Sequence, residues 1–260
     1  MSGSARTPSI TTPNPISMIK LSTLSAAALA ALVGFNLALP AHAADAPARK
    51  APLGLDASPA IKVAKLGSAK VNPDGFLSRW FLLDPIPGTG QVNESAVRAA
   101  AQKEYFPEQL SVVPHAGDKV KVGDAEYTWH PIEAKFHNVN LYHFAFYQGK
   151  ETSNVVFWGV TVVNSPEDIP NVRLAVGSNS GSVWWVNGKE TVALYGDIQT
   201  FIDDTASKKF TLKKGPNVVR FVVVNNRGMV DCCARFLDAN DKPLTQLTTT
   251  LGDPAVSTAR

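Results

Sequence analysis

The sequence predicts an antiparallel β-sandwich, and residues 171–235 give the main reasons. Strand-like runs rich in Val, Phe and Trp alternate here with tight turns, and no helical period is present. Asn187-Gly188 stands between two apolar runs. Asn-Gly is the strongest short hairpin signal, because a type I′ turn needs positive φ at both central residues. With further turns expected at 214–217 and 225–228, the pattern is typical of a sandwich.

The composition is that of an ordinary globular protein, with 260 residues, 45% hydrophobic and 18% charged. The formal net charge is +3, and Arg6 and Lys20 of the leader described below supply part of it, so the remaining chain is nearly balanced. The lysine pairs at 208–209 and 213–214 are interpreted as solvated strand ends. Because a nucleic-acid binder would cluster basic residues on one face, no nucleic-acid partner is expected.

Residues 1–43 are predicted to be a signal peptide, with translation beginning at Met1 or Met18. Lys20 precedes the apolar run 21–39, and the chain then reads A-H-A up to Ala43, which is a cleavage signal. The alternative is a membrane anchor, because the run is near the ~20 residues that span a bilayer. The A-H-A sequence that ends at Ala43 favours a cleaved signal peptide over an anchor. No other stretch is apolar enough to span a membrane, so we expect a periplasmic or secreted protein.

Three segments are expected after the leader. Residues 44–75, rich in Ala, Pro and Lys, are predicted to be a linker or N-terminal arm. Residues 76–251 should form the β-sandwich domain, and 252–260 a tail. Only one short helix is predicted, near 94–105, with Asn93 as its cap.

Strands are predicted at the apolar runs, which are 79–84, 118–122, 126–130, 140–147 and 154–164. The last of these is almost continuously apolar, so it should be covered on both faces and lie centrally. The segment 171–235 should add four or five more strands. The segment 237–251 is a candidate for an edge strand.

Several of these residues resemble a known family. The segment 80–87 (WFLLDPIP) is similar to the "W-l-l-G-P-F-p" opening of jelly-roll domains in bacterial exported carbohydrate-active proteins. The segments VRLAVGS, VWWVNGK, LKKGPN and RFLD, which begin at 172, 183, 212 and 235, resemble the galactose-binding-like β-sandwich, which is related to many carbohydrate-binding modules. Over about residues 76–245, the resemblance implies a jelly-roll sandwich and a carbohydrate ligand. Asp84 departs from the family's Gly, and Asn179-Ser180 from its frequent acidic pair.

The two adjacent tryptophans, Trp184 and Trp185, should face opposite sides of a strand. The resemblance gives the core position to Trp185 and leaves Trp184 as a platform that stacks on a sugar ring. The alternative is that Trp184 packs under a loop or the helix. The candidate ligand-binding residues near the hairpin ends are Trp184, Tyr195, Asp203, Asn226 and Arg227.

No catalytic motif or cofactor site is predicted. Asp203 and Asp204 should diverge on an extended segment, whereas the acids of a glycosidase must converge. The spacing of His130, His137 and His143 matches no zinc pattern. A structural Ca²⁺ that uses one of the two carboxylates is an option without further support.

Cys232 and Cys233 are the only cysteines. An even count in an exported protein suggests a disulfide. Neighbouring Cα atoms, ~3.8 Å apart, are closer than the usual disulfide range, so a vicinal bridge would be strained and redox-labile. The alternative is two thiols in a strand, with one facing the core.

The favoured hypothesis is an exported, non-catalytic carbohydrate-binding β-sandwich protein. One alternative is a structural or interaction subunit of a cell-envelope complex, which would bind through an edge strand or an apolar patch. A polysaccharide hydrolase or esterase is less favoured, because the sequence shows no converging acids and no Ser/His pair. An exposed aromatic ring flanked by polar residues would support sugar binding.

Overall fold

The computed structural model of the chain describes residues 51–196 and 199–252. These residues form two β-sheets and two short α-helices, and every strand pairing among them is antiparallel. The predicted mainly antiparallel sandwich is confirmed. The predicted signal peptide and nearly all of the predicted tail lie outside the described residues.

The larger sheet has 11 strands. They are β1 (Ile61–Val63), β2 (Gly67–Lys70), β3 (Arg79–Leu83), β4 (Ile86–Pro87), β5 (Lys119–Val122), β6 (Ala125–Ala134), β8 (Val155–Ser165), β10 (Gly181–Val186), β11 (Lys189–Leu194), β14 (Gly215–Asn225) and β16 (Thr248–Leu251). The main path runs β1-β6-β3-β8-β14-β10-β11. β8 and β14 therefore occupy the middle, and β11 ends the path on one side.

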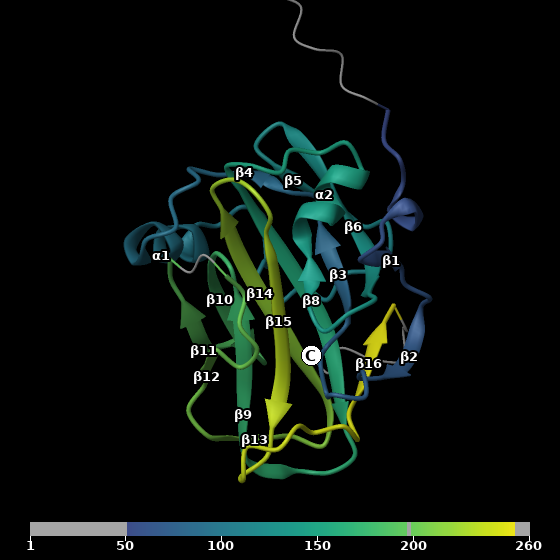
Figure 1. The fold of residues 1–260 in the computed structure, drawn as a ribbon, viewed down its shortest axis with the longest axis vertical. Helices are drawn as coiled ribbons and strands as arrows, with labels where there is room; N and C mark the ends of the chain where they lie inside the picture. Colours follow the sequence, from purple (N-terminus) through teal and green to yellow (C-terminus); the bar gives the residue numbers. More distant parts are fainter. Residues whose placement is uncertain (1–50, 197–198, 253–260) are drawn as a thin grey trace, which may run out of the picture. The chain divides into compact units, whose positions relative to one another are not determined.

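The smaller sheet has five strands. They are β7 (Val139–Asn140), β9 (Ile169–Ser178), β12 (Thr205–Ala206), β13 (Phe210–Leu212) and β15 (Asp231–Leu237). Figure 1 shows β9 and β15 crossing in front of β8 and β14, so the two sheets stack face to face. Two helices, α1 (Glu94–Gln102) and α2 (Leu141–Tyr147), and a 3₁₀ turn at Leu55–Ala57 complete the described fold.

Both faces of the large sheet are covered, which gives the domain two apolar cores. Between the sheets, Trp80, Trp184 and Phe221 pack with Leu174 and Phe236 of the small sheet. On the opposite face, the large sheet is covered by α1 and by the segment that follows it. The residues packed there include Val97, Tyr105, Phe106, Trp129, Trp158 and Trp185. The side chains on both faces of β10 are therefore buried.

The predicted hairpin at Asn187-Gly188 is confirmed. The two residues have φ angles of 52° and 75° and join β10 to β11. The side chain of Asn187 also fixes the turn to the neighbouring strand, because its Oδ1 accepts a hydrogen bond from the amide of Val218 at 2.8 Å. Its Nδ2 donates to Oδ1 of Asn217 at 2.9 Å.

The predicted central strand is β8, which pairs with β14 along its whole length. A close approach in this pair requires glycine, because a Cβ at Gly159 would lie 2.3 Å from the ring of Phe221. The ring thus lies over Gly159 and meets Trp80 and Trp184, each with a centroid distance of 4.9 Å.

The predicted helix is α1, and its cap is confirmed. Oδ1 of Asn93 accepts a hydrogen bond from the amide of Ala96 at 3.0 Å. The helix ends at Gln102, earlier than the predicted residue 105. It packs against β10, where Val97 occupies the space that a Cβ at Gly181 would need.

The prediction of a strand over residues 140–147 is wrong, because this segment forms α2. Oδ1 of Asn140 accepts from the amide of His143 at 2.7 Å and so caps the helix. Leu141, Phe144 and Ala145 are the buried residues, and this spacing is helical. The aromatic residues that favour a strand here lie on a short amphipathic helix instead.

The predicted start of the domain at Phe76 is too late. β1 pairs with β6, and β2 pairs with β16, so residues of the predicted arm belong to the large sheet. β16 pairs with both β2 and β8, which places it inside the sheet rather than at an edge. The buried guanidinium of Arg79 donates to the carbonyls of Lys65, Gly67 and Thr249 and ties these strands together.

Asp84, which departs from the resembled family's Gly, is a buried junction. Its carboxylate accepts hydrogen bonds from the Thr128 amide (3.0 Å), from Nε2 of His130 (3.0 Å) and from Nζ of Lys150 (3.1 Å). Burial alone would raise the pKa of Asp84. The hydrogen bonds from His130, Thr128 and Lys150 outweigh it and lower the pKa below its ordinary value.

Replacing Trp184 with Ala should destabilise the protein by about 3–5 kcal/mol, because it empties the centre of the inter-sheet core. The matched control is Phe136→Ala, which removes a ring that is 59% exposed. Urea unfolding should show a change within about 0.5 kcal/mol for the control. Equal midpoints for Trp184→Ala and the wild type would contradict the core position.

Asp84→Asn should lower the free energy of unfolding at neutral pH by about 1–3 kcal/mol, because the donors of Thr128, His130 and Lys150 lose their shared carboxylate. The folded-state pKa of Asp84 is depressed, so its contribution is present above the unfolded pKa of ~3.9 and disappears as the pH falls through the lower folded value. Urea unfolding at several pH values should therefore show the variant and wild type converging in acid. The control is the exposed Asp124→Asn, which should change the free energy of unfolding at neutral pH by less than about 0.5 kcal/mol. A constant Asp84→Asn gap down to pH ~2 would refute the assignment.

Candidate ligand site

The structure places Trp184 in the core. Its side chain is 0% exposed, its Nε1 donates to Oγ of Ser182 at 3.0 Å, and its ring lies 6.0 Å from that of Trp80. The prediction that Trp184 is a stacking platform is therefore wrong. Trp185 does face the opposite side, as predicted, but it is also buried and stacks on Trp158 at 5.9 Å. Neither indole is open to a ligand, because both faces of the sheet are covered.

Tyr195 lies at the end of β11 beside α1, and its side chain is half-buried. The guanidinium carbon of Arg98 lies 5.4 Å from the centroid of its ring. Arg98 in turn pairs with Glu190 of β11, and this hydrogen bond raises the pKa of Arg98. Tyr195 therefore belongs to a contact between α1 and the edge of the large sheet.

Asp203 is engaged in an ion pair on the small sheet. Its two carboxylate oxygens accept from Nε of Arg235 at 2.9 and 3.1 Å. Asn226 and Arg227 lie exposed in the loop after β14, where the Asn226 carbonyl accepts from the Asn154 amide at 2.7 Å. No hydrogen bond or ion pair links Tyr195, Asp203 and this loop within residues 51–196 and 199–252. Their role in ligand binding stays a prediction.

Cys232 and Cys233 are free thiols that point to opposite sides of β15. Cys232 lies in the inter-sheet core, and Sγ of Cys233 lies 3.9 Å from the Phe201 carbonyl. Burial raises the pKa of Cys233 to about 12 and the pKa of Cys232 well above its ordinary value. The structure contains no vicinal disulfide between them. It agrees with the alternative prediction of two thiols in a strand, one of which faces the core.

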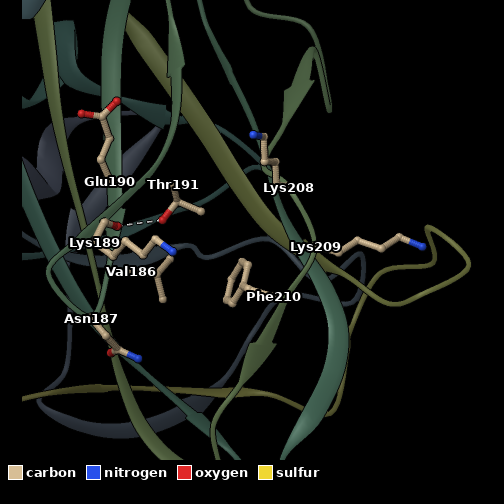
Figure 2. Close-up of a pocket in the computed structure, with 8 residues that line it drawn as sticks. All are labelled: Val186, Asn187, Lys189, Glu190, Thr191, Lys208, Lys209 and Phe210. Atoms are coloured by element: carbon tan, nitrogen blue, oxygen red, sulfur yellow. Dashed lines mark hydrogen bonds between the residues drawn. The ribbon is translucent and has the colours of Figure 1, made fainter.

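A cavity of about 380 Å³ opens at one edge of the sandwich, and we call it the edge pocket. One wall is the β10–β11 hairpin, and the other is the chain that leads into β13 (Figure 2). It is lined by Val186, Asn187, Lys189, Glu190, Thr191, Lys208, Lys209 and Phe210. The pocket exists because β11 ends the large sheet while β13 pairs only with β9 in the small one.

Phe210 supplies the aromatic surface of the edge pocket. The ring is partly buried and packs edge-on against Phe236, with 6.3 Å between the ring centroids. Figure 2 shows the ring projecting into the space opposite the hairpin, with the Lys189 side chain running toward it. Packing on one side thus holds the ring while the other side faces the cavity.

The polar groups of the edge pocket differ in whether they are already engaged. Glu190 is paired with Arg98, and Nζ of Lys209 donates to the Ala239 carbonyl at 3.1 Å. The backbone carbonyls of Lys189 and Lys208 accept hydrogen bonds from Thr191 and Ser207, but their ammonium groups have no partner among the residues that the structure describes. The pocket therefore offers a ring, an apolar floor at Val186 and two unengaged ammonium groups. Such an arrangement can bind and orient a small polar molecule.

Sequence reasoning did not find this pocket. It identified the pair Lys208-Lys209 only as a solvated strand end, and it did not consider Phe210. The signal available was an aromatic residue next to that pair. The pocket depends on how the edges of two sheets meet, which no local pattern encodes.

Two other cavities expose aromatic rings. The larger, about 720 Å³, is lined by Phe136 and by residues whose charges are mostly engaged, such as Glu133, which pairs with Lys62 at 3.0 Å. The other, about 440 Å³, lies at α2, where Phe146 stacks on Tyr142 at 5.7 Å next to Leu53. Neither combines a held ring with two unengaged cationic side chains.

Within residues 51–196 and 199–252, no group of three or more His, Cys, Asp or Glu side chains could hold a metal ion. None of the helices there is long and apolar enough to cross a membrane.

Comparison with known proteins gives distant structural likenesses only. No protein-family model matches the chain, and no curated protein does. The PA14 domain of the MpAFP antifreeze protein is similar with a TM-score of 0.42 and 12% identity, over 66% of this chain and 91% of that one. The PA14 sugar-binding domain from an RTX adhesin gives a TM-score of 0.40 and 12% identity, over 68% and 99%.

A β-glucosidase from Kluyveromyces marxianus in complex with glucose is similar over 48% of this chain and 16% of its own length, with a TM-score of 0.33 and 18% identity. These likenesses are to PA14 domains and to part of an enzyme, and none specifies the galactose-binding-like family. That finer resemblance stays a prediction. At such identities no ligand residue can be transferred to this chain.

The two thiols should be unreactive in the folded protein, because burial disfavours the thiolate that reacts. A chromogenic disulfide reagent at mildly alkaline pH should label neither cysteine natively and both after unfolding in guanidinium. A Cys233→Ser variant should release one equivalent on unfolding. Rapid native labelling, or no free thiol after unfolding without reductant, would contradict the buried, reduced pair.

Proposed function

We propose that the protein is an exported, non-catalytic carbohydrate-binding β-sandwich protein and that the sugar binds in the edge pocket. The observation that carries this proposal is the partly buried ring of Phe210, which faces a cavity of about 380 Å³ with unengaged polar side chains on its rim. A cavity of this size is within the usual range for small-molecule sites, roughly 300–1,000 Å³. The structural likenesses, with TM-scores below 0.5, contribute nothing to it.

The chemistry of the pocket suits a sugar. One face of a pyranose ring carries C–H groups that can lie against the flat side of Phe210, next to the apolar Val186. Its hydroxyl groups can hydrogen-bond to Lys189, Lys208 and Thr191 around the rim. Asn187 keeps the hairpin wall in place through its bonds to β14, so little order has to be gained on binding.

The pocket has too few free carboxylates for glycoside hydrolysis, and this supports a binding role without catalysis. Glu190 is the one acidic residue among the eight that line it, and its carboxylate is paired with Arg98. Glycoside hydrolysis commonly needs two carboxyl groups that converge on the scissile bond. The pocket as built therefore favours holding a sugar over cleaving it.

A second candidate is an interaction subunit of a cell-envelope complex. It is favoured by the aromatic surface at α2, where Phe146 is 48% exposed and stacked on Tyr142, and by the neighbouring Leu53. An exposed apolar patch of this kind is typical of a protein-binding surface. A folded protein that binds no glycan but loses a co-purifying partner in a Phe146→Ser variant would support this role.

Phe210→Leu should weaken sugar binding by about tenfold or more, because leucine keeps most of the packing on Phe236 but has no flat face. The purified protein, expressed from the full sequence, is first screened against polysaccharides and short glycans, and hits are measured by calorimetry. Phe136→Leu is the matched control and should bind as the wild type does. A loss in Phe136→Leu alone would move the site to the larger cavity, and a blank screen on folded protein would contradict the proposed function.

A further inference from the structure

The charged groups of the edge pocket that have no partner within the protein are all positive. Four charged residues line it, and they are Lys189, Glu190, Lys208 and Lys209. Arg98 of α1 takes the carboxylate of Glu190, and the Ala239 carbonyl takes the ammonium group of Lys209. The pocket therefore presents two cationic groups and no unengaged carboxylate.

Some other lysines of the described fold have acidic partners. Lys213 pairs with Asp168 at 3.0 Å, Lys119 with Glu126 at 3.2 Å, and Lys150 with the buried Asp84 at 3.1 Å. Lys189 and Lys208 differ from these in two ways: no acid of the described chain is paired with them, and they border a concave site with an apolar floor. A ligand can supply the missing negative charge.

The two lysines stand on opposite walls of the edge pocket. Lys189 belongs to the hairpin wall and Lys208 to the opposite wall, between β12 and β13. In Figure 2 the Lys189 side chain extends across the pocket toward Phe210, whereas Lys209 points away from it. The ring of Phe210 lies on the same wall as Lys208, so an acidic substituent and a sugar ring can be held together.

We propose that the ligand of the edge pocket is an acidic sugar, whose ring lies on Phe210 and whose anionic substituent is bound by Lys189 and Lys208. This inference rests on the proposed sugar-binding function and specifies its ligand class. A uronic-acid carboxylate and a sulfate ester are two anionic substituents of sugars that ammonium groups can bind. Because both lysines are exposed, the attraction is screened by salt.

The test compares each acidic glycan with a neutral counterpart of the same backbone. Oligogalacturonate and its carboxyl-reduced form probe a carboxylate, and dextran sulfate and dextran probe a sulfate. The purified protein is titrated by calorimetry at low salt and again at about 0.5 M NaCl. At least one acidic glycan should bind about tenfold or more tightly than its neutral counterpart, and added salt should reduce that advantage.

Charge-removing variants identify the groups responsible. Lys189→Gln and Lys208→Gln should each lower the affinity for the acidic glycan about fivefold or more, and should lower the affinity for a neutral sugar clearly less, because glutamine can still hydrogen-bond to a hydroxyl but carries no charge. Lys209→Gln is the matched control, since its ammonium group is bound to Ala239, and it should have little effect. All three positions are exposed, so the variants should keep the wild-type melting temperature.

Failure of this inference can be told apart from failure of the proposed function. Equal binding of acidic and neutral glycans, lost in Phe210→Leu, would overturn the acidic ligand and leave the sugar site intact. Acidic selectivity that survives both Lys189→Gln and Lys208→Gln would also overturn it. If no glycan of either kind binds to the folded protein, the proposed function fails together with the inference.

Discussion

β8 and β14 run side by side through the middle of the large sheet, and apolar layers cover both of their faces. The small sheet lies over one face, and α1 with the chain after it lies over the other. This double burial uses the large aromatic side chains as packing. Trp80, Trp184 and Phe221 meet in one core, and Trp158 and Trp185 stack in the other. Neither flat face of the large sheet is therefore open to a ligand, and the proposed binding site lies at an edge.

Contacts from β14, α1 and β15 hold the side chains at the edge formed by β11 and at the neighbouring β13. Asn187 fastens the hairpin to β14, and Arg98 of α1 holds Glu190. Within the small sheet, Phe236 of β15 holds the ring of Phe210 of β13. Each contact removes freedom from one lining group before any ligand arrives, and pre-organisation of this kind lowers the entropic cost of binding. The ammonium groups of Lys189 and Lys208 are left to meet the ligand.

Local chemistry explains which parts of the fold could be predicted from the sequence. The Asn187-Gly188 turn, the Asn93 cap and the central strand β8 depend on residues close together in the chain, and all three were predictable. The strands β1 and β2 were not, because these segments of three and four residues gain order only from distant partners, β6 and β16. Burial of Trp184 depends on a second layer over the sheet, and Phe210 becomes part of a site only where two sheet edges meet.

In the proposed complex, a glycan enters between the β10–β11 hairpin and the chain leading into β13. Mapping of amide chemical shifts during titration with the glycan that binds best tests it most directly, because every residue reports separately. The account predicts saturable shifts concentrated at 187–191 and 208–210, with the loop at Asn226 and Arg227 unchanged. Shifts concentrated at that loop, or around Phe136, with a silent hairpin would contradict it.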